Sequence, residues 1–202
     1  MMPHRTMSRF AATLLVATAS FALPACRGGS STTTTSGPVA VFTPDTAAPP
    51  AATIALLPGS SSGASVNVRV TVTGVTGFFG AAFRVSYDTT ALLFNGMTDS
   101  GSFLRVGVTD NDVIFLEDHA SHPGEVVITA TRKDPTVVGP VNVATTSDLV
   151  VLNFLARKAI VAAAAEGRLD FSDPKQVCDG TVAAPGCGAI TVTWSGGGVS
   201  AQ

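Results

Sequence analysis

A strict alternation of valines with polar residues over residues 65–73 constrains the fold more than any other stretch of this chain. Successive side chains of an extended chain point to opposite sides, so the alternation predicts a strand with one side in a core. The pattern restarts over residues 83–87, after a connection bounded by Gly74 and Gly77, and predicts a second strand. Two strands cannot bury enough apolar surface alone, so the remaining chain must complete the sheet. The alternating valines are Val66, Val68, Val70 and Val72.

Short apolar runs separated by Gly, Pro, Asp and Asn recur along the rest of the chain. Together with 20 Gly and 12 Pro among 202 residues, they predict an all-β sandwich or jelly roll. The alanine-rich residues 160–166 favour helix by propensity but are few, so we expect a loop with at most one helical turn there. The further expected strands are residues 53–57, 91–97, 101–104, 113–117, 125–131, 141–144, 149–157, 168–171 and 189–194.

The N-terminal residues 1–25 have the pattern of a signal peptide, because basic residues precede an apolar run that is too short to span a bilayer. Residues 23–26, Leu-Pro-Ala-Cys, resemble the bacterial lipobox, although Pro24 departs from it. The resemblance implies cleavage before Cys26, a lipid on its sulfur, and an extracytoplasmic protein anchored in the cell envelope. Arg27 favours the outer membrane if the cell has two membranes. The alternative is an ordinary signal peptide followed by a chance cysteine.

Residues 26–52 are rich in Gly, Ser, Thr, Pro and Ala and have almost no charge or periodicity, so we expect a flexible tether. Residues 53–196 then form one folded domain, and residues 197–202 a disordered tail. Charged residues make up only 13% of the chain and the net charge is −2, which excludes the basic surface that nucleic acid requires. We expect a monomer that meets the membrane only through its lipid.

Several segments resemble the cohesin domain family. Residues 83–88, Phe-Arg-Val-Ser-Tyr-Asp, followed by the apolar residues 91–94, look like the cohesin signature, with Thr89 where the family often has proline. Residues 101–104, 124–128 and 149–154 recur in family order, so the resemblance covers roughly residues 53–194. It implies a nine-stranded jelly roll that binds a partner protein, such as one bearing a dockerin, through an exposed face of one sheet and without catalysis. The competing sandwich is a related carbohydrate-binding module.

The partner face is inferred from the alternation in three strands. The residues opposite the core side form a mostly neutral, hydroxyl-rich set that suits a modest protein interface. The alternative is a solvated sheet face with no partner. The six residues are Arg84, Ser86, Thr129, Thr131, Asn153 and Leu155.

A second hypothesis is a module that holds polysaccharide at the cell surface. Sugar recognition uses exposed flat aromatic rings, and Phe78, Phe79 and Trp194 form the candidate platform. Exposure of Phe78 and Trp194 on one flat patch would favour this hypothesis, whereas burial of both would favour protein docking.

Cys178 and Cys187 are the cysteines that remain besides Cys26, and in an oxidising envelope we expect them to form a disulfide. The alternative is two free thiols.

The remaining polar motifs do not predict catalysis or a cofactor. Residues 59–63 match G-x-S-x-G, but a strand follows where a nucleophile elbow needs a helix. Residues 117–122 hold two histidines and two carboxylates, which suit either a polar turn or a divalent metal. Residues 110–112 hint at calcium but lack the EF-hand ligands that should follow, which leaves only an incidental ion. No nucleophile, base and orienting group converge in sequence, so we expect no enzyme activity.

Overall fold

The computed structural model describes residues 38–181 and 187–202. The predicted signal peptide, Cys26 and residues 26–37 of the predicted tether lie outside the described residues. The described chain is all-β, as predicted, with thirteen strands and three short 3-10 helices. None of the helices in this described part is long and apolar enough to cross a membrane.

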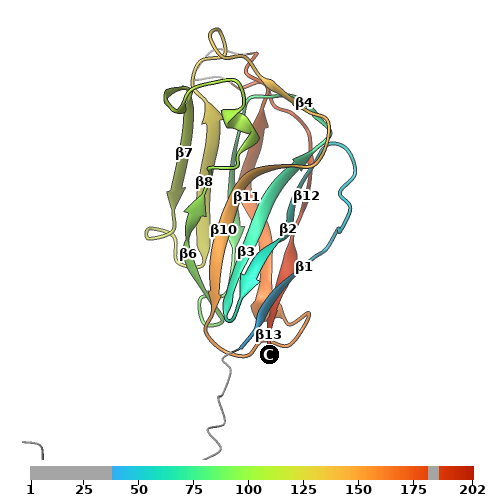
Figure 1. The fold of residues 1–202 in the computed structure, drawn as a ribbon, viewed down its shortest axis with the longest axis vertical. Coiled ribbons are helices and arrows are strands. Elements are labelled where there is room, and N and C mark those ends of the chain that lie inside the picture. The colour runs from blue at the N-terminus through green and yellow to red at the C-terminus, as the bar shows by residue number, and fades with distance from the viewer. Residues whose placement is uncertain (1–37, 182–186) are drawn as a thin grey trace, which may run out of the picture. The chain divides into compact units, whose positions relative to one another are not determined.

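Two mostly antiparallel sheets pack against one another (Figure 1). The six-stranded sheet has the order β1-β13-β11-β5-β8-β7, and the five-stranded sheet the order β12-β2-β3-β10-β6, in which β12 runs parallel to β2. The strands of the first are β1 (Ala40–Pro44), β13 (Gly197–Ala201), β11 (Arg168–Cys178), β5 (Gly80–Ser86), β8 (Glu125–Arg132) and β7 (Val113–Asp118). Those of the second are β12 (Thr193–Ser195), β2 (Thr53–Ser62), β3 (Ser65–Thr73), β10 (Ser147–Ala156) and β6 (Leu92–Thr98).

Smaller elements close the ends of the sandwich. Two short strands, β4 (Val75–Phe78) and β9 (Val141–Val143), pair with one another outside the two main sheets. The 3-10 helices are η1 (Phe103–Arg105), η2 (Asp110–Asp112) and η3 (Ala165–Gly167). The last of these confirms the prediction of at most one helical turn over residues 160–166.

The alternating valines form the centre of the five-stranded sheet. β3 has the predicted bounds and is paired with β2 on one side and β10 on the other. All four valines are fully buried, which confirms that this side of the strand faces the core. Each such side chain contributes roughly 1.5–3 kcal/mol of hydrophobic stabilisation when removed from water. The strand with the clearest sequence pattern therefore lies between β2 and β10 and pairs with both.

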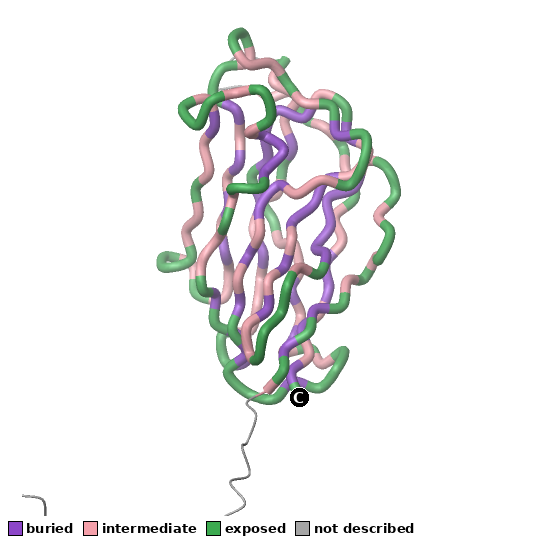
Figure 2. Tube along the Cα trace, viewed as in Figure 1, coloured by how far each residue is buried: buried purple, intermediate pink, exposed green. Residues whose placement is uncertain are grey.

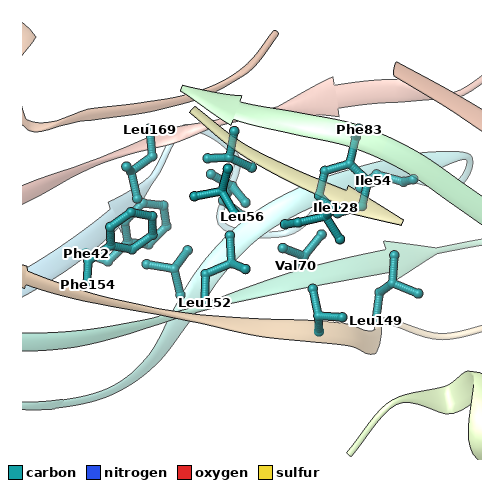
Figure 3. Packing of buried hydrophobic residues seen from close by; sticks show 14 of the residues in the cluster. Phe42, Ile54, Leu56, Val70, Phe83, Ile128, Leu149, Leu152, Phe154 and Leu169 are labelled. Atoms are coloured by element: carbon teal, nitrogen blue, oxygen red, sulfur yellow. The ribbon is translucent and has the colours of Figure 1, made fainter. Parts of the chain in front are cut away.

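The core fills the space between the two sheets. Figure 3 shows side chains from both sheets pointing into it, with Phe42 beside Phe154 and with Phe83, Ile54 and Ile128 grouped together. Aromatic rings meet edge to face, as between Phe94 and Phe154 with centroids 5.4 Å apart. Buried and less buried residues alternate along the strands of both sheets, while the connections at the ends are mostly exposed (Figure 2).

The predictions of a disordered tail and of a flexible tether up to residue 52 are wrong, because parts of both segments form paired strands of the domain. Within residues 26–52, β1 lies antiparallel to β13, which occupies most of the predicted tail. Phe42 and Val199 from this pair are buried in the core. Gly197 looked like a sign of disorder, but a Cβ there would overlap the ring of Phe42, so glycine is required for the two strands to pack. The two strands place the start of β1 beside the C-terminus (Figure 1).

Several predicted element boundaries are also corrected. The strand expected over residues 101–104 gives way to η1, because Ser102 accepts a hydrogen bond from Leu104 N and caps a short helix. β2 continues beyond the predicted end at residue 57 to Ser62, with a register shift between Pro58 and Ser61. β11 is longer than expected, the strand at residues 189–194 is reduced to β12, and β4 was not predicted. The count is thus thirteen described strands instead of nine, within the predicted class.

Candidate functional site

The outward side of β11, β5, β8 and β7 forms a continuous sheet surface, called here the outer face. Along β5 and β8 its residues alternate with buried neighbours that face the core, and β7 and β11 extend the same side through their pairing with β8 and β5. Register places these residues in rows across the sheet, so that Leu116 lies beside Thr129 and Thr129 beside Ala82. The members used below are Ala82, Arg84, Ser86, Ile114, Leu116, Val127, Thr129, Thr131 and Ser172.

The middle of the outer face is apolar and open. Leu116 is 62% exposed although it lies within a regular strand, and Ala82 in the same row is also exposed. Val127 and Ile114 are half-buried on the same side. An exposed leucine alone is ordinary on a protein surface. A leucine flanked by further short apolar and hydroxyl side chains across three strands forms a flat surface that another protein can cover.

Charged groups on the outer face are tied to one another at one end. Arg84 Nη1 donates to Glu125 Oε2 at 3.0 Å, and Ser172 Oγ donates to Glu125 Oε1 at 2.8 Å. Ser86 Oγ donates to the carbonyl of Asp170 at 3.1 Å. These bonds fix the side chains across β8, β5 and β11. The face therefore presents a pre-ordered polar edge beside its apolar middle.

Four of the six predicted partner-face residues lie together on the outer face. Arg84 and Ser86 come from β5, and Thr129 and Thr131 come from β8, paired in the same sheet. The placement of Asn153 and Leu155 with them is wrong, because both lie on β10 in the other sheet. Alternation within a strand shows which residues share a side of that strand. It does not show to which sheet the strand belongs.

The outer face has members that the prediction missed. Val127 shares its side of β8 with Thr129 and Thr131, so alternation could have identified it. Ile114 and Leu116 alternate along β7 in the same way, but both sides of β7 carry apolar residues, so sequence alone does not show which side is open. The register with β8 decides this, because Ile114 and Leu116 lie opposite the outward-facing Thr131 and Thr129.

The predicted aromatic platform is wrong for two of its three members. Phe78 is fully buried and its ring packs edge to face on Phe103, with centroids 5.1 Å apart, and Phe79 is buried as well. Phe residues of a sandwich are more often core than surface, and these two follow that tendency. Trp194 is half-buried and packs against Phe171 and Phe83. No flat patch of Phe78 and Trp194 forms.

The predicted disulfide is present in the structure. Cys178 ends β11, and its Cα lies 5.2 Å from that of Cys187. The bridge spans nine residues, and Cys178 also pairs with Ala189 in an isolated bridge. Closing a loop of this size stabilises the fold by roughly 2–3 kcal/mol in the chain-entropy model.

The metal hypotheses gain no support from the geometry. His119 pairs with Glu117, and His122 Nδ1 lies 3.5 Å from Asp118 Oδ2, so the four groups form two separate pairs. Asp112 instead accepts from Thr109 N and Thr109 Oγ1, and these bonds lower the pKa of its carboxyl. Across residues 38–181 and 187–202, no three His, Cys, Asp or Glu side chains gather as a metal site. Residues 59–62 of the G-x-S-x-G motif lie on β2, outside any strand-to-helix turn.

Comparison with known proteins agrees with this architecture. The model of the cohesin domain matches residues 51–177, more than half of the chain. The chain belongs to the cohesin domain family. No curated protein sequence matches it.

Solved cohesin modules share the fold at low sequence identity. A type II cohesin, A11, from Bacteroides cellulosolvens is 15% identical with a TM-score of 0.53, and covers 79% of this chain and 97% of its own. A type II cohesin domain from the cellulosome of Acetivibrio cellulolyticus is 14% identical with a TM-score of 0.51, covering 80% and 94%. The sixth cohesin of scaffoldin B from Acetivibrio cellulolyticus, solved in complex with a mutant Cel5 dockerin, is 19% identical with a TM-score of 0.50, covering 81% and 96%.

Proposed function

We propose that this cohesin is a non-catalytic docking module and that its outer face receives a partner protein. The observation that carries the proposal is the open middle of that face, where Leu116 is 62% exposed in one row with Thr129 and Ala82. Protein interfaces combine an apolar centre with a polar rim, and the bonded group of Arg84, Glu125 and Ser172 supplies such a rim.

The partner we propose is a protein that bears a dockerin or a domain of similar role. The cohesin of scaffoldin B is recorded in complex with a dockerin, and this chain shares its fold. The polar edge of the outer face is only partly paired, because Arg84 Nη1 is bonded to Glu125 while Arg84 Nε has no partner among the described residues. The partner should therefore contribute apolar side chains over Leu116 and hydrogen-bonding groups toward Arg84 and Glu125. A complementary arrangement of this kind determines specificity more than affinity.

We also propose that the module is presented on the cell envelope by a lipid on Cys26. The support comes from the sequence, namely the signal-peptide pattern before Cys26 and the Gly- and Ser-rich segment after it. More than one acyl chain is needed for stable anchoring, which the lipobox type of processing supplies. Mass spectrometry of the N-terminal peptide from the native membrane fraction tests this, since an unmodified Cys26 would contradict it.

The docking proposal is tested with the full chain in detergent. Proteins of the source organism that crosslink to it are identified, and their affinities are then measured for the wild type and three variants. Leu116→Asp and Arg84→Glu should each weaken binding at least about 10-fold, because they place or invert a charge within the proposed contact. Leu155→Asp is the matched control, since Leu155 is a 39% exposed leucine on the other sheet, and it should bind as the wild type does.

Two results would contradict this assignment. If Leu155→Asp abolishes binding while Leu116→Asp does not, the docking surface lies on the five-stranded sheet. If no protein crosslinks specifically to the folded chain, the docking function itself is wrong.

A further inference from the structure

A cleft opens beside Trp194, away from the middle of the outer face, and is called here the Trp194 cleft. Its volume is about 520 Å³, and its lining includes Asp45, Asp170, Lys175, Thr193, Trp194 and Ser195. Binding sites for small molecules typically have volumes of about 300–1,000 Å³. The cleft therefore has room for a ligand larger than a single ion.

The course of β11 and β12 explains why a cleft exists at this place. β11 pairs with β13 only at Arg168 and Leu169, because the chain that leads into β13 comes from β12, which is paired with β2 in the other sheet. Beyond Leu169 the two segments diverge, and the cleft lies where they part. Gly196 lines it at the branch, where a Cβ would meet Asp170 and the carbonyl of Leu169.

One wall of the cleft is aromatic and firmly held. The Trp194 ring packs edge to face on Phe171, with centroids 4.8 Å apart, and at a tilt against Phe83, 5.8 Å away. These contacts fix the indole while leaving it half-buried. A fixed aromatic surface is the kind of group against which the C–H face of a sugar ring packs, since the ring carries negative charge on its face and large apolar area.

The rest of the cleft lining is largely polar, and its charged groups are ordered by ion pairs. Arg168 donates to both oxygens of Asp45, at 2.7 and 2.8 Å, and its Nε donates to Asp170 Oδ2 at 3.2 Å. The hydrogen bonds from Arg168 lower the pKa of Asp45, so its carboxylate remains an acceptor at neutral pH. Lys175 Nζ is bonded in the same way to Asp173 Oδ1 at 2.9 Å.

This pairing of charges selects the chemistry of the ligand. Asp45 and Asp170 carry two negative charges, which Arg168 and Lys175 together balance, so the cleft offers little net charge for a free ion. Carboxylate oxygens have about four acceptor sites between them, so those not used by Arg168 can still accept from hydroxyl groups. Thr193 and Ser195 add hydroxyls that both donate and accept. A neutral molecule with many hydroxyls and an apolar ring face satisfies all of these groups.

We infer from this geometry that the Trp194 cleft binds a neutral oligosaccharide. The cleft shares β11 with the outer face, but its lining includes none of Leu116, Thr129 and Ala82, so the inference does not rest on the docking proposal. Both ligands can be held by one module, a protein on the outer face and a glycan beside it. The groups that contact the sugar are the indole of Trp194, the carboxylates of Asp45 and Asp170, and the ammonium of Lys175.

The chain offers a direct readout, because Trp194 is its only tryptophan. The full chain in detergent is titrated with cellohexaose, xylohexaose and mannohexaose while intrinsic fluorescence is recorded. At least one of the three should change the emission in a saturable manner, because a sugar over the indole displaces water from it. Glycerol, a polyol without a ring, serves as the control and should give no saturable change.

Variants locate the site and separate it from docking. Trp194→Phe and the double variant Asp170→Asn with Lys175→Ala should each weaken binding about 10-fold by isothermal titration calorimetry, since each removes contacts in the cleft. Leu116→Asp should leave sugar affinity unchanged, while it is expected to weaken protein docking. Thermal unfolding confirms that each variant is folded.

Two outcomes would overturn the inference. One is the absence of saturable binding to all three oligosaccharides by a wild-type protein that unfolds cooperatively. The other is sugar binding that the cleft variants leave unchanged, which would place the glycan elsewhere on the molecule.

Discussion

The outward sides of the two sheets differ in how their side chains are used. On the five-stranded sheet, polar groups bond across strands to their own neighbours. Arg69 Nε donates to the carbonyl of Pro58 at 3.1 Å and its Nη1 to Asp148 at 3.0 Å, while Asn67 donates to Ser60 at 2.7 Å and Asn153 to the carbonyl of Gly96 at 3.2 Å. These bonds run along much of that surface. The same surface also carries Leu93 and Leu155, which lie opposite one another and are 38% and 39% exposed.

On the outer face of the six-stranded sheet, the charged side chains that bond across strands gather at one end. There Glu125 bonds Arg84 and Ser172, whereas the row of Leu116, Thr129 and Ala82 carries short or apolar side chains, and Gln176 at its end donates to Cys187 Sγ at 3.1 Å. The two sheets have the same alternation of side chains but use their outward side chains differently. Side-chain bonds between strands stabilise the fold, and an open apolar row is available for a partner.

The largest expected effect is on stability, and it compares two adjacent residues of β10. Phe154 is fully buried between the sheets, while Leu155 points outward. Phe154→Ala should lower the free energy of unfolding by about 3–5 kcal/mol, because it removes a large side chain and leaves a cavity. Leu155→Ala should change it by less than about 1 kcal/mol. Urea unfolding of the full chain measures both. Equal losses would mean that the outward side of this sheet also forms part of the core.

A smaller effect distinguishes the two outward surfaces directly. Arg69→Ala removes two bonds on the five-stranded sheet and should cost about 1 kcal/mol of unfolding free energy, since both partners are partly exposed and solvent screens the ion pair. Leu116→Ser should alter stability by about 0.5 kcal/mol or less.

Partner binding should show the reverse order for these two variants, with Leu116→Ser weakened and Arg69→Ala unaffected. The comparison fails if Leu116→Ser is the more destabilising of the two, because Leu116 would then be needed for the fold. Chemical unfolding and a binding measurement on the same preparations decide the order.

The smallest expected effect is a pH dependence at the edge of the six-stranded sheet. The hydrogen bonds from Arg168 lower the pKa of Asp45 below its ordinary value of 3.8. A lowered pKa stabilises the fold fully above the unfolded value and loses that contribution as the pH falls through the folded value. The melting temperature should therefore decrease as the pH is lowered below about 4.

Asp45→Asn should make this fall shallower, because asparagine does not titrate and cannot pair with Arg168 as an anion. Melting curves between pH 6 and pH 2.5 for the two proteins measure the difference. Identical slopes would show that the pairing of Asp45 with Arg168, which holds the end of β1, contributes nothing to stability.

Much of the fold could be predicted because local alternation and burial agree. Residues 65–73 became β3 with unchanged bounds, and residues 125–131 became β8 with one further residue. The errors occurred where a local signal was reversed by packing. Gly197 and its neighbours looked disordered, yet the close approach of Phe42 makes glycine necessary there. Phe103 and Leu104 are buried as their apolar character suggests, but in a helical turn.

The candidate site was predictable in part for the same reason. Alternation along each strand was sufficient for four residues, because they lie on adjacent strands and share one outward side. These are Arg84, Ser86, Thr129 and Thr131. Asn153 and Leu155 have the same parity but pair with β3 and β6. The Trp194 cleft had no sequence signal beyond the tryptophan, since its walls come from residues as far apart as Asp45, Asp170 and Trp194.

The sequence by itself determined the class of fold, the family, and the side on which each residue of the clear strands lies. These depend on the alternation of side chains along one strand and on turn residues, which are local properties. Tertiary structure alone decided which strands share a sheet, which outward side stays open, and where the two sheets part to leave a cleft. Those features depend on pairing between segments far apart in the chain, such as β1 with β13, and on close contacts that no single segment contains.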